Sequence, residues 1–263
     1  GNWAGQSGGS FQADTLNDQT LNSWSGFIET DFDVSEKLNI WASLRYTRDD
    51  KHIDFDQLVP GCELVCHSFW RNVLGLNQVF LADGVTTDIT KSQIEGHINN
   101  DFLFTNWSPG GGITYRHNDD LTFFAKVVTG FKAGGFNENS GVVENLPLEE
   151  ETSTSYEIGT NAKLADGRVA LRASGFFHQR RDTVIAIDDP ALPPDVNLIG
   201  ASNADVDTWG AELEIASHPM NGLEINAAVG YLKTKFTRFS SLKAGTLFDF
   251  SGNRVPLVYD WTV

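Results

Sequence analysis

Two cysteines and a histidine lie close together in the longest polar span of this 263-residue sequence. Cys62, Cys66 and His67 carry side chains that can bind a metal ion, and the cysteines can also form a disulfide. A structural zinc site normally needs four protein ligands, and the sequence offers no second cysteine pair. In a compartment that permits oxidation, a local disulfide explains the pair with fewer demands. We therefore predict a disulfide between Cys62 and Cys66, with a metal site as the alternative.

Residue patterns for catalysis are missing elsewhere in the sequence. The six histidines are scattered, and we find no nucleophile elbow, phosphate-binding loop or dinucleotide fingerprint. The acidic run at residues 149–151 is typical of a solvated loop face, although it could attract cations. The formal net charge of −16 argues against sequence-independent binding of nucleic acid. The sequence therefore predicts no enzyme, no resident cofactor and no nucleic-acid partner.

Apolar side chains recur at every second position in several long segments, which is typical of strands with one apolar face. Residues 121–130 are the clearest case, and they end in the glycine-rich sequence GFKAGGFN. The same alternation predicts strands at residues 21–33, 38–48, 102–116, 153–164, 169–187, 204–217 and 223–235, and the start of one at 258–263. Pro109 interrupts the third of these strands, which predicts a bulge or a sheet edge there.

The connections between these strands alternate between short and long. The long spans are residues 1–19, 49–100, 132–151, 188–203 and 236–257, and the others are tight turns. Outer-membrane barrels have this arrangement, with short periplasmic turns and long extracellular loops. The apolar faces would then meet lipid. The aromatic girdles or the apolar band would include Tyr46, Tyr115, Phe131, Phe177, Trp209 and Tyr231. The opposite face would line a polar lumen, and its charged residues would be Arg45, Lys126, Glu157, Arg172 and Glu212.

Six segments resemble the β-barrel domain of TonB-dependent outer-membrane receptors. They are residues 31–50, 104–115, 121–137, 155–164, 203–215 and 222–235, and they occur in the order found in that family. The resemblance implies an all-β fold, an antiparallel meander of about eight long strands within a transmembrane β-barrel. The plug domain and the terminal strands of the family are not visible, so we expect residues 1–263 to be an internal fragment of the barrel domain.

The resemblance also implies a function. We expect a receptor in the outer membrane of a Gram-negative bacterium that takes up a scarce, large solute such as a ferric siderophore. Transport would be energised by the TonB–ExbB–ExbD complex through the plug domain, and the ferric chelate would be cargo rather than cofactor. Trp70 and Phe136, on predicted outer loops, could stack on the solute, although an ordinary loop anchor explains them equally well. The alternative is a secreted, soluble, all-β carbohydrate-binding protein.

Overall fold

The computed structural model describes residues 14–58, 96–136, 147–187, 200–243 and 246–263. Within these ranges the chain forms eight long strands: β1 (Asp14–Ser35), β2 (Leu38–Leu58), β3 (Gly96–Asn118), β4 (Leu121–Lys132), β7 (Glu151–Leu164), β8 (Val169–Ile187), β9 (Gly200–Met220) and β10 (Leu223–Arg238). Five short strands accompany them: β5 (Gly135–Phe136), β6 (Pro147–Leu148), β11 (Ser240–Lys243), β12 (Thr246–Asp249) and β13 (Trp261–Thr262). The predicted all-β class and the meander of long strands are confirmed.

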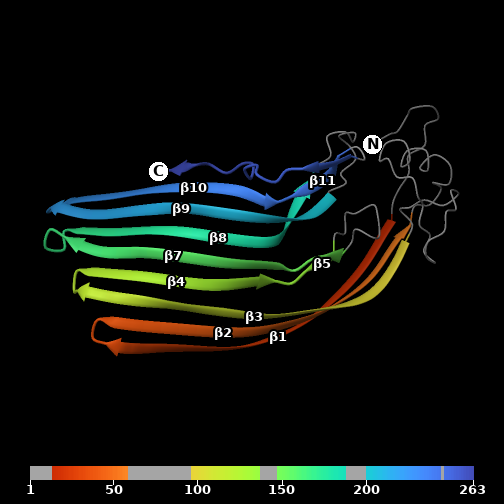
Figure 1. The fold of residues 1–263 in the computed structure, drawn as a ribbon, viewed down its shortest axis with the longest axis horizontal. Coiled ribbons are helices and arrows are strands. Elements are labelled where there is room, and N and C mark those ends of the chain that lie inside the picture. Colours follow the sequence, from red (N-terminus) through yellow and green to blue (C-terminus); the bar gives the residue numbers. More distant parts are fainter. Residues whose placement is uncertain (1–13, 59–95, 137–146, 188–199, 244–245) are drawn as a thin grey trace.

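The long strands form one antiparallel sheet in which each strand pairs with its neighbour along the chain. The order is β1-β2-β3-β4-β7-β8-β9-β10-β13. Tight turns join the strands at one end of the sheet, on the left in Figure 1, and the longer connections lie at the other end. Among the described residues, no helix is long and apolar enough to cross a membrane.

The strands are longer than the sequence predicted, mainly at the end opposite the tight turns. Residues 49–58 and 96–100 were expected in a loop, yet β2 and β3 pair without interruption from Leu38↔Tyr115 to Gln57↔Gly96. On β2 this extension is mostly polar, with the buried Ile53 as an exception, so it lacks the alternation from which the other strands were recognised. At the chain's end the expected strand at 258–263 is reduced to Trp261–Thr262, which pair with β10.

Pro109 lies where β3 loses one of its two neighbours. Its pairing with Leu44 on β2 is regular, whereas the ladder between β3 and β4 begins only at Gly110. The Thr129 hydroxyl on β4 donates a hydrogen bond of 2.8 Å to the Pro109 carbonyl. Because a strand residue directs its N–H and C=O to the same side, the missing proline N–H faces β4 and leaves the pairing with β2 intact. The edge predicted from the sequence is confirmed, and there is no bulge between β2 and β3 at this proline.

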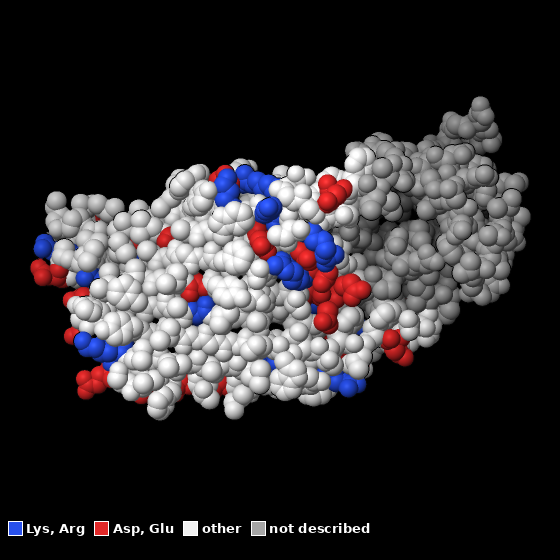
Figure 2. All heavy atoms as spheres, viewed as in Figure 1, with Lys and Arg blue, Asp and Glu red and all other residues white. Residues whose placement is uncertain are grey.

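The two faces of the sheet differ in composition. The register aligns Ile28, Leu44, Val127, Ile158 and Leu213 on one face, which we call the apolar face. Large apolar side chains are exposed along it, including Ile28 at 63% and Ile158 at 67% of full exposure. Figure 2 shows one face of the molecule, on which charged side chains gather mostly toward the two ends of the strands. A water-soluble sheet would cover such a face with a second layer.

Aromatic side chains form a row across the apolar face, near the middle of most of the long strands. The row consists of Trp24, Tyr46, Trp107, Tyr156, Phe177, Trp209, Tyr231 and Trp261. Neighbouring rings lie 4.7 to 6.3 Å apart in the pairs Trp24–Tyr46, Tyr46–Trp107, Tyr156–Phe177 and Tyr231–Trp261. We call this the aromatic row. It contains four of the predicted residues, Tyr46, Phe177, Trp209 and Tyr231, whereas Tyr115 and Phe131 lie on the same face but outside the row.

The aromatic row crosses the strands obliquely. From β1 to β13 its position shifts by eight strand residues relative to the pairing register, about 27 Å along the strands. The eight strand spacings it crosses cover about 38 Å. If the row lies level in a membrane, the strands tilt by about 35°, within the range of outer-membrane barrels. On β3, Tyr115 lies eight residues from Trp107 on the side of the tight turn. At this tilt it is about 22 Å below Trp107 along the membrane normal, which is close to the ~25 Å height of a lipid-facing band.

Candidate functional site: a polar face and an aromatic–lysine cluster

The five charged residues predicted to line a lumen all lie on the face opposite the apolar face, which we call the polar face. The register places Arg45 and Lys126 on this face of the sheet, and it places Glu157, Arg172 and Glu212 there as well. The fold therefore brings together residues that are separated by as many as 167 positions in the sequence. That this face lines a lumen stays a prediction.

Most of these charges have partners on adjacent strands. The Lys126 ammonium lies 2.8 Å from a carboxylate oxygen of Glu157, which is directly opposite it in the register. The Arg172 guanidinium donates to the Asn161 carbonyl oxygen at 3.1 Å and lies 3.5 Å from the Glu214 carboxylate. Arg45 donates to the Ser25 hydroxyl at 2.5 Å. Because these charged groups are paired with one another, the pattern is typical of a hydrated structural surface and not of a reactive site.

Phe136 is the predicted ligand-binding residue that the structure describes, and it lies within a cluster of aromatic rings. Its ring meets the Phe102 ring edge to face, with 5.0 Å between centroids, and Phe102 lies 6.5 Å from Phe104. The Lys51 ammonium lies 5.8 Å from the centre of the Phe104 ring. We call these four residues the Phe102 cluster. Lys51, Phe102 and Phe104 lie on the polar face, because they share the register alternation of Arg45.

Glycine at position 134 allows this cluster to assemble. A Cβ atom at Gly134 would lie 2.2 Å from the Leu148 carbonyl oxygen and 2.7 Å from the Phe104 ring. No side chain fits there, so the chain passes directly against Phe104, and the Lys51 ammonium donates a hydrogen bond to the Gly134 carbonyl. Beyond it, Gly135 and Phe136 pair with Leu148 and Pro147. The glycines of GFKAGGFN therefore hold Phe136 over the extension of β2 and β3.

Sequence reasoning missed three of the four members of the Phe102 cluster. Lys51 was assigned to a loop, and Phe102 and Phe104 were treated only as part of a strand. A usable signal was present, because two phenylalanines at alternate positions must share one face of a strand. Their pairing with the segment around Lys51 could be found only from the register, Lys51↔Phe102 and Asp49↔Phe104.

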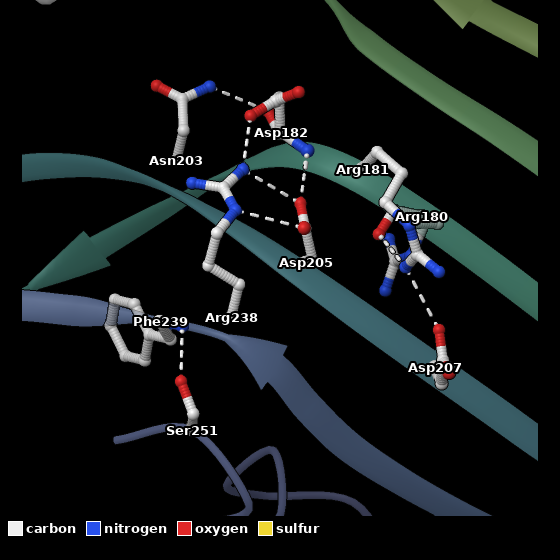
Figure 3. A network of polar contacts seen from close by, with 9 residues as sticks. All are labelled: Arg180, Arg181, Asp182, Asn203, Asp205, Asp207, Arg238, Phe239 and Ser251. Carbon is white, nitrogen blue, oxygen red and sulfur yellow. Dashed lines mark hydrogen bonds and ion pairs between the residues drawn. The ribbon is translucent and has the colours of Figure 1, made fainter. Parts of the chain in front are cut away.

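A second polar network ties β8, β9 and β10 together beyond the aromatic row (Figure 3). Arg238 binds Asp205 with two hydrogen bonds of 2.9 Å and lies 2.5 Å from Asp182. Asp182 lies in a register shift of β8 with a φ of 55°, and its backbone N–H donates to Asp205 at 3.0 Å. Nearby, Arg181 bonds Asp207 at 2.9 Å. These bonds stabilise the irregular backbone of β8 at the register shift, where regular pairing with β9 is interrupted.

Two carboxyl groups at this end of the sheet have shifted acidities. Partial burial would raise the pKa of Asp205, but hydrogen bonds from Arg238 and from the Asp182 N–H lower it overall. The pKa of Glu150 is raised, first by its burial and then by repulsion from Glu149 and Asp182. Within the described part of the chain, no three His, Cys, Asp or Glu residues are placed to hold a metal ion. Trp70, Cys62 and Cys66 lie outside the described residues, so their predicted roles stay predictions.

Comparison with known proteins identifies a family profile that matches the whole chain and relatives that match parts of it. The sequence profile of the TonB dependent receptor-like β-barrel matches residues 1–263. The metal-pseudopaline receptor CntO of Pseudomonas aeruginosa is 21% identical over 213 residues, which are 76% of this chain and 27% of that protein. The probable TonB-dependent siderophore receptor PiuA of Acinetobacter baumannii is 26% identical over 157 residues, which are 56% of this chain and 20% of PiuA.

Solved structures share the fold at low sequence identity. The ferric yersiniabactin uptake receptor FyuA of Yersinia pestis aligns with a TM-score of 0.64 and 17% identity, covering 95% of this chain and 31% of FyuA. The PiuA structure aligns with a TM-score of 0.63 and 18% identity, covering 93% of this chain and 30% of PiuA. The chain thus spans less than a third of each of these proteins.

Proposed function

The chain belongs to the TonB-dependent receptor β-barrel family, and from this we propose that it forms part of the wall and outer mouth of a receptor that imports a ferric siderophore. The family consists of transport receptors of the Gram-negative outer membrane, so the predicted localisation is confirmed and the soluble carbohydrate-binding alternative is set aside. The relatives PiuA and CntO are named as receptors for a siderophore and for metal-pseudopaline, which supports a chelated metal as the cargo.

The division of the sheet into two faces is the observation that carries this proposal. The apolar face presents exposed large side chains and ends at the aromatic row, as a surface in contact with lipid requires. The polar face carries ion pairs such as Lys126–Glu157, as a wall in contact with water or polar protein allows. On this proposal the work of the protein is binding and conformational release, with the TonB–ExbB–ExbD complex acting through a plug domain outside this chain. No bond chemistry and no resident cofactor are involved.

The Phe102 cluster is our candidate for solute contact at the mouth. All four of its side chains are half-buried, so ring and ammonium surface remains accessible. Aromatic rings stack on flat ligands, and a Lys ammonium attracts an anionic metal chelate. The cluster lies beyond the aromatic row on the polar face, where a solute entering from the loop side would first meet the wall.

Two substitutions in the complete receptor test this assignment. Phe136→Ala should weaken binding of a ferric tris-catecholate to whole cells by about 2- to 12-fold, the range expected for one aromatic contact. Lys51→Met should weaken binding of the anionic tris-catecholate more than binding of a neutral ferric hydroxamate. Phe32→Ala is the matched control, because Phe32 lies exposed on the apolar face of β1.

The amount of folded receptor, measured by heat-modifiable gel mobility, separates binding from anchoring. Normal insertion with weakened binding supports solute contact. Loss of the folded band in Phe136→Ala would show that the ring serves as an anchor against Phe102. Unchanged binding of both chelates in both variants would remove the cluster from the binding site.

A further inference from the structure

A shallow groove of about 730 Å³ crosses the apolar face of the sheet between β4 and β13. Its floor consists of small residues on β7, β8 and β9: Thr160, Ala173, Gly175 and Ala211. Larger apolar side chains flank the floor on both sides, and they are Phe123, Ile158, Leu213, Val229, Tyr231 and Trp261. The groove is therefore a local depression in the apolar face, with small residues on three adjacent strands as its floor.

The groove descends from the aromatic row into the apolar band. Its upper end is formed by Tyr231 and Trp261, whose rings lie 4.8 Å apart within the row. On β8 its floor reaches Ala173, four residues from Phe177 of the row, which is about 11 Å lower at the tilt derived above. A depression that starts at the interface and descends toward the middle of the bilayer follows the course of a lipid acyl chain.

Positive charge lies at the upper end of the groove. The Lys233 ammonium is 5.9 Å from the centre of the Tyr231 ring, and it shares the Asp260 carboxylate with Arg254, each at 2.5 Å. The three side chains carry a net charge of +1, in a chain whose net charge is −16. This local excess of positive charge would attract an anionic head group.

We propose that this groove is a binding site for one anionic membrane lipid, with an acyl chain over Gly175 and the head-group phosphate at Lys233 and Arg254. The inference depends on the membrane location of the family, and it is independent of the solute proposed for the Phe102 cluster. The groove is continuous with the lipid-facing band, which indicates that its occupant is a lipid. The cations at its upper end indicate that the head group of this lipid is anionic.

Gly175 offers a clean way to fill the groove. A Cβ at this position would meet the Gly210 carbonyl oxygen at 3.8 Å, an ordinary contact, so the backbone there accepts a residue with a side chain. Gly26 is the matched control, since it lies on the apolar face of β1 and a Cβ there would have nothing within 4 Å. Gly175→Leu and Gly26→Leu thus add the same side chain to the same face, inside and outside the groove.

The experiment measures lipid retained by the purified complete receptor in native mass spectrometry, with phosphatidylglycerol or phosphatidylcholine added. We expect one tightly retained phosphatidylglycerol, with weaker retention of phosphatidylcholine. Gly175→Leu should lower this retention by about threefold or more, because packing contacts determine association within lipid. Lys233→Gln should lower the preference for phosphatidylglycerol by about fivefold, the contribution of one cation near an anionic head group.

Two controls keep the result specific. Gly26→Leu should retain lipid like the unmodified receptor, and Lys126→Gln, which removes a paired cation from the polar face, should do so too. Heat-modifiable mobility confirms that each variant is folded. Equal retention in folded Gly175→Leu and Gly26→Leu, or equal retention of the two phospholipids by the unmodified receptor, would overturn the proposal without affecting the proposed solute binding.

Discussion

A single arginine placed in the middle of the apolar face provides the sharpest test of the membrane topology. Leu213 lies on β9, four residues from Trp209 of the aromatic row, and pairs with Ala173 and Val229 on the same face. Four strand residues span about 14 Å, or about 11 Å along the membrane normal at a tilt of 35°. The lipid-facing band of outer-membrane barrels is about 25 Å tall, so Leu213 lies close to its midplane.

The expected cost of Leu213→Arg follows from this depth. Arginine on the lipid face costs about 2–4 kcal/mol at the midplane, because no water is available to solvate the guanidinium there. At about 1.4 kcal/mol for each factor of ten, the ratio of inserted to uninserted receptor should fall by about 30- to 700-fold. Glu212→Arg is the control, because Glu212 is the adjacent residue on the polar face and the same arginine there meets no lipid.

The assay is refolding of the complete receptor into phosphatidylcholine vesicles across a urea series, with the folded fraction read from heat-modifiable gel mobility. Leu213→Arg should need much less urea to lose its folded band, and Glu212→Arg should behave like the unmodified receptor. If both variants fold equally well, the apolar face does not meet lipid. If Glu212→Arg is the more damaging of the two, the faces are assigned the wrong way round.

Three further outcomes are expected. Gly159→Val should lower the free energy of unfolding by about 1–3 kcal/mol in the same assay, because a Cβ there would lie 2.5 Å from an overlying phenyl ring and 2.7 Å from a carbonyl oxygen, whereas Gly26→Val should be neutral. Arg238→Gln should cost less than about 1 kcal/mol at pH 7, because the guanidinium is more than half exposed. The pKa of its partner Asp205 is lowered, so the stability that this pair contributes is present above the usual Asp pKa and is lost as the pH falls through the lowered value. Arg238→Gln should therefore lose less stability than the unmodified receptor when unfolding is measured between pH 7 and pH 3. Mass spectrometry of unreduced receptor should find Cys62 and Cys66 oxidised, and two free thiols or a bound zinc ion would contradict that prediction.

The sequence predicted the strands best where one face of the sheet is apolar. On β4 and β7, every second side chain between Leu121 and Val127, and between Tyr156 and Leu164, serves the apolar face, so alternation reveals the strand. Beyond the aromatic row this alternation is lost, and residues 49–58 are mostly polar, with the buried Ile53 as an exception, while still pairing with β3. Periodicity cannot detect a strand in which polar residues predominate at both alternating sets of positions, so the sequence predicted a loop for this extension.

The candidate site was harder to predict for a related reason. The charged residues of the polar face could be found because they occupy the gaps in the apolar alternation, as Lys126 and Glu157 do. The Phe102 cluster depends instead on register and on a close approach of the chain at Gly134, and neither is visible in a single strand. Its four members come from three segments, so their proximity is a property of the assembled sheet.

The polar face also holds large aromatic side chains that alternation alone would assign to the wrong environment, and their register explains them. Trp41 lies directly opposite Gly112, Phe124 opposite Gly159, and Phe176 opposite Gly210. A Cβ at each of these glycines would lie within 2.7 Å of the facing ring, so each ring lies against the backbone of the next strand. A slip of two residues, which would keep the faces correct, would place the Phe124 and Phe176 rings against a side chain in either direction. It would do so for Trp41 in only one direction, because Gly110 lies two residues from Gly112. The Phe124–Gly159 and Phe176–Gly210 pairs therefore specify the register of β4 with β7 and of β8 with β9, on a face where polar residues could pair in several ways.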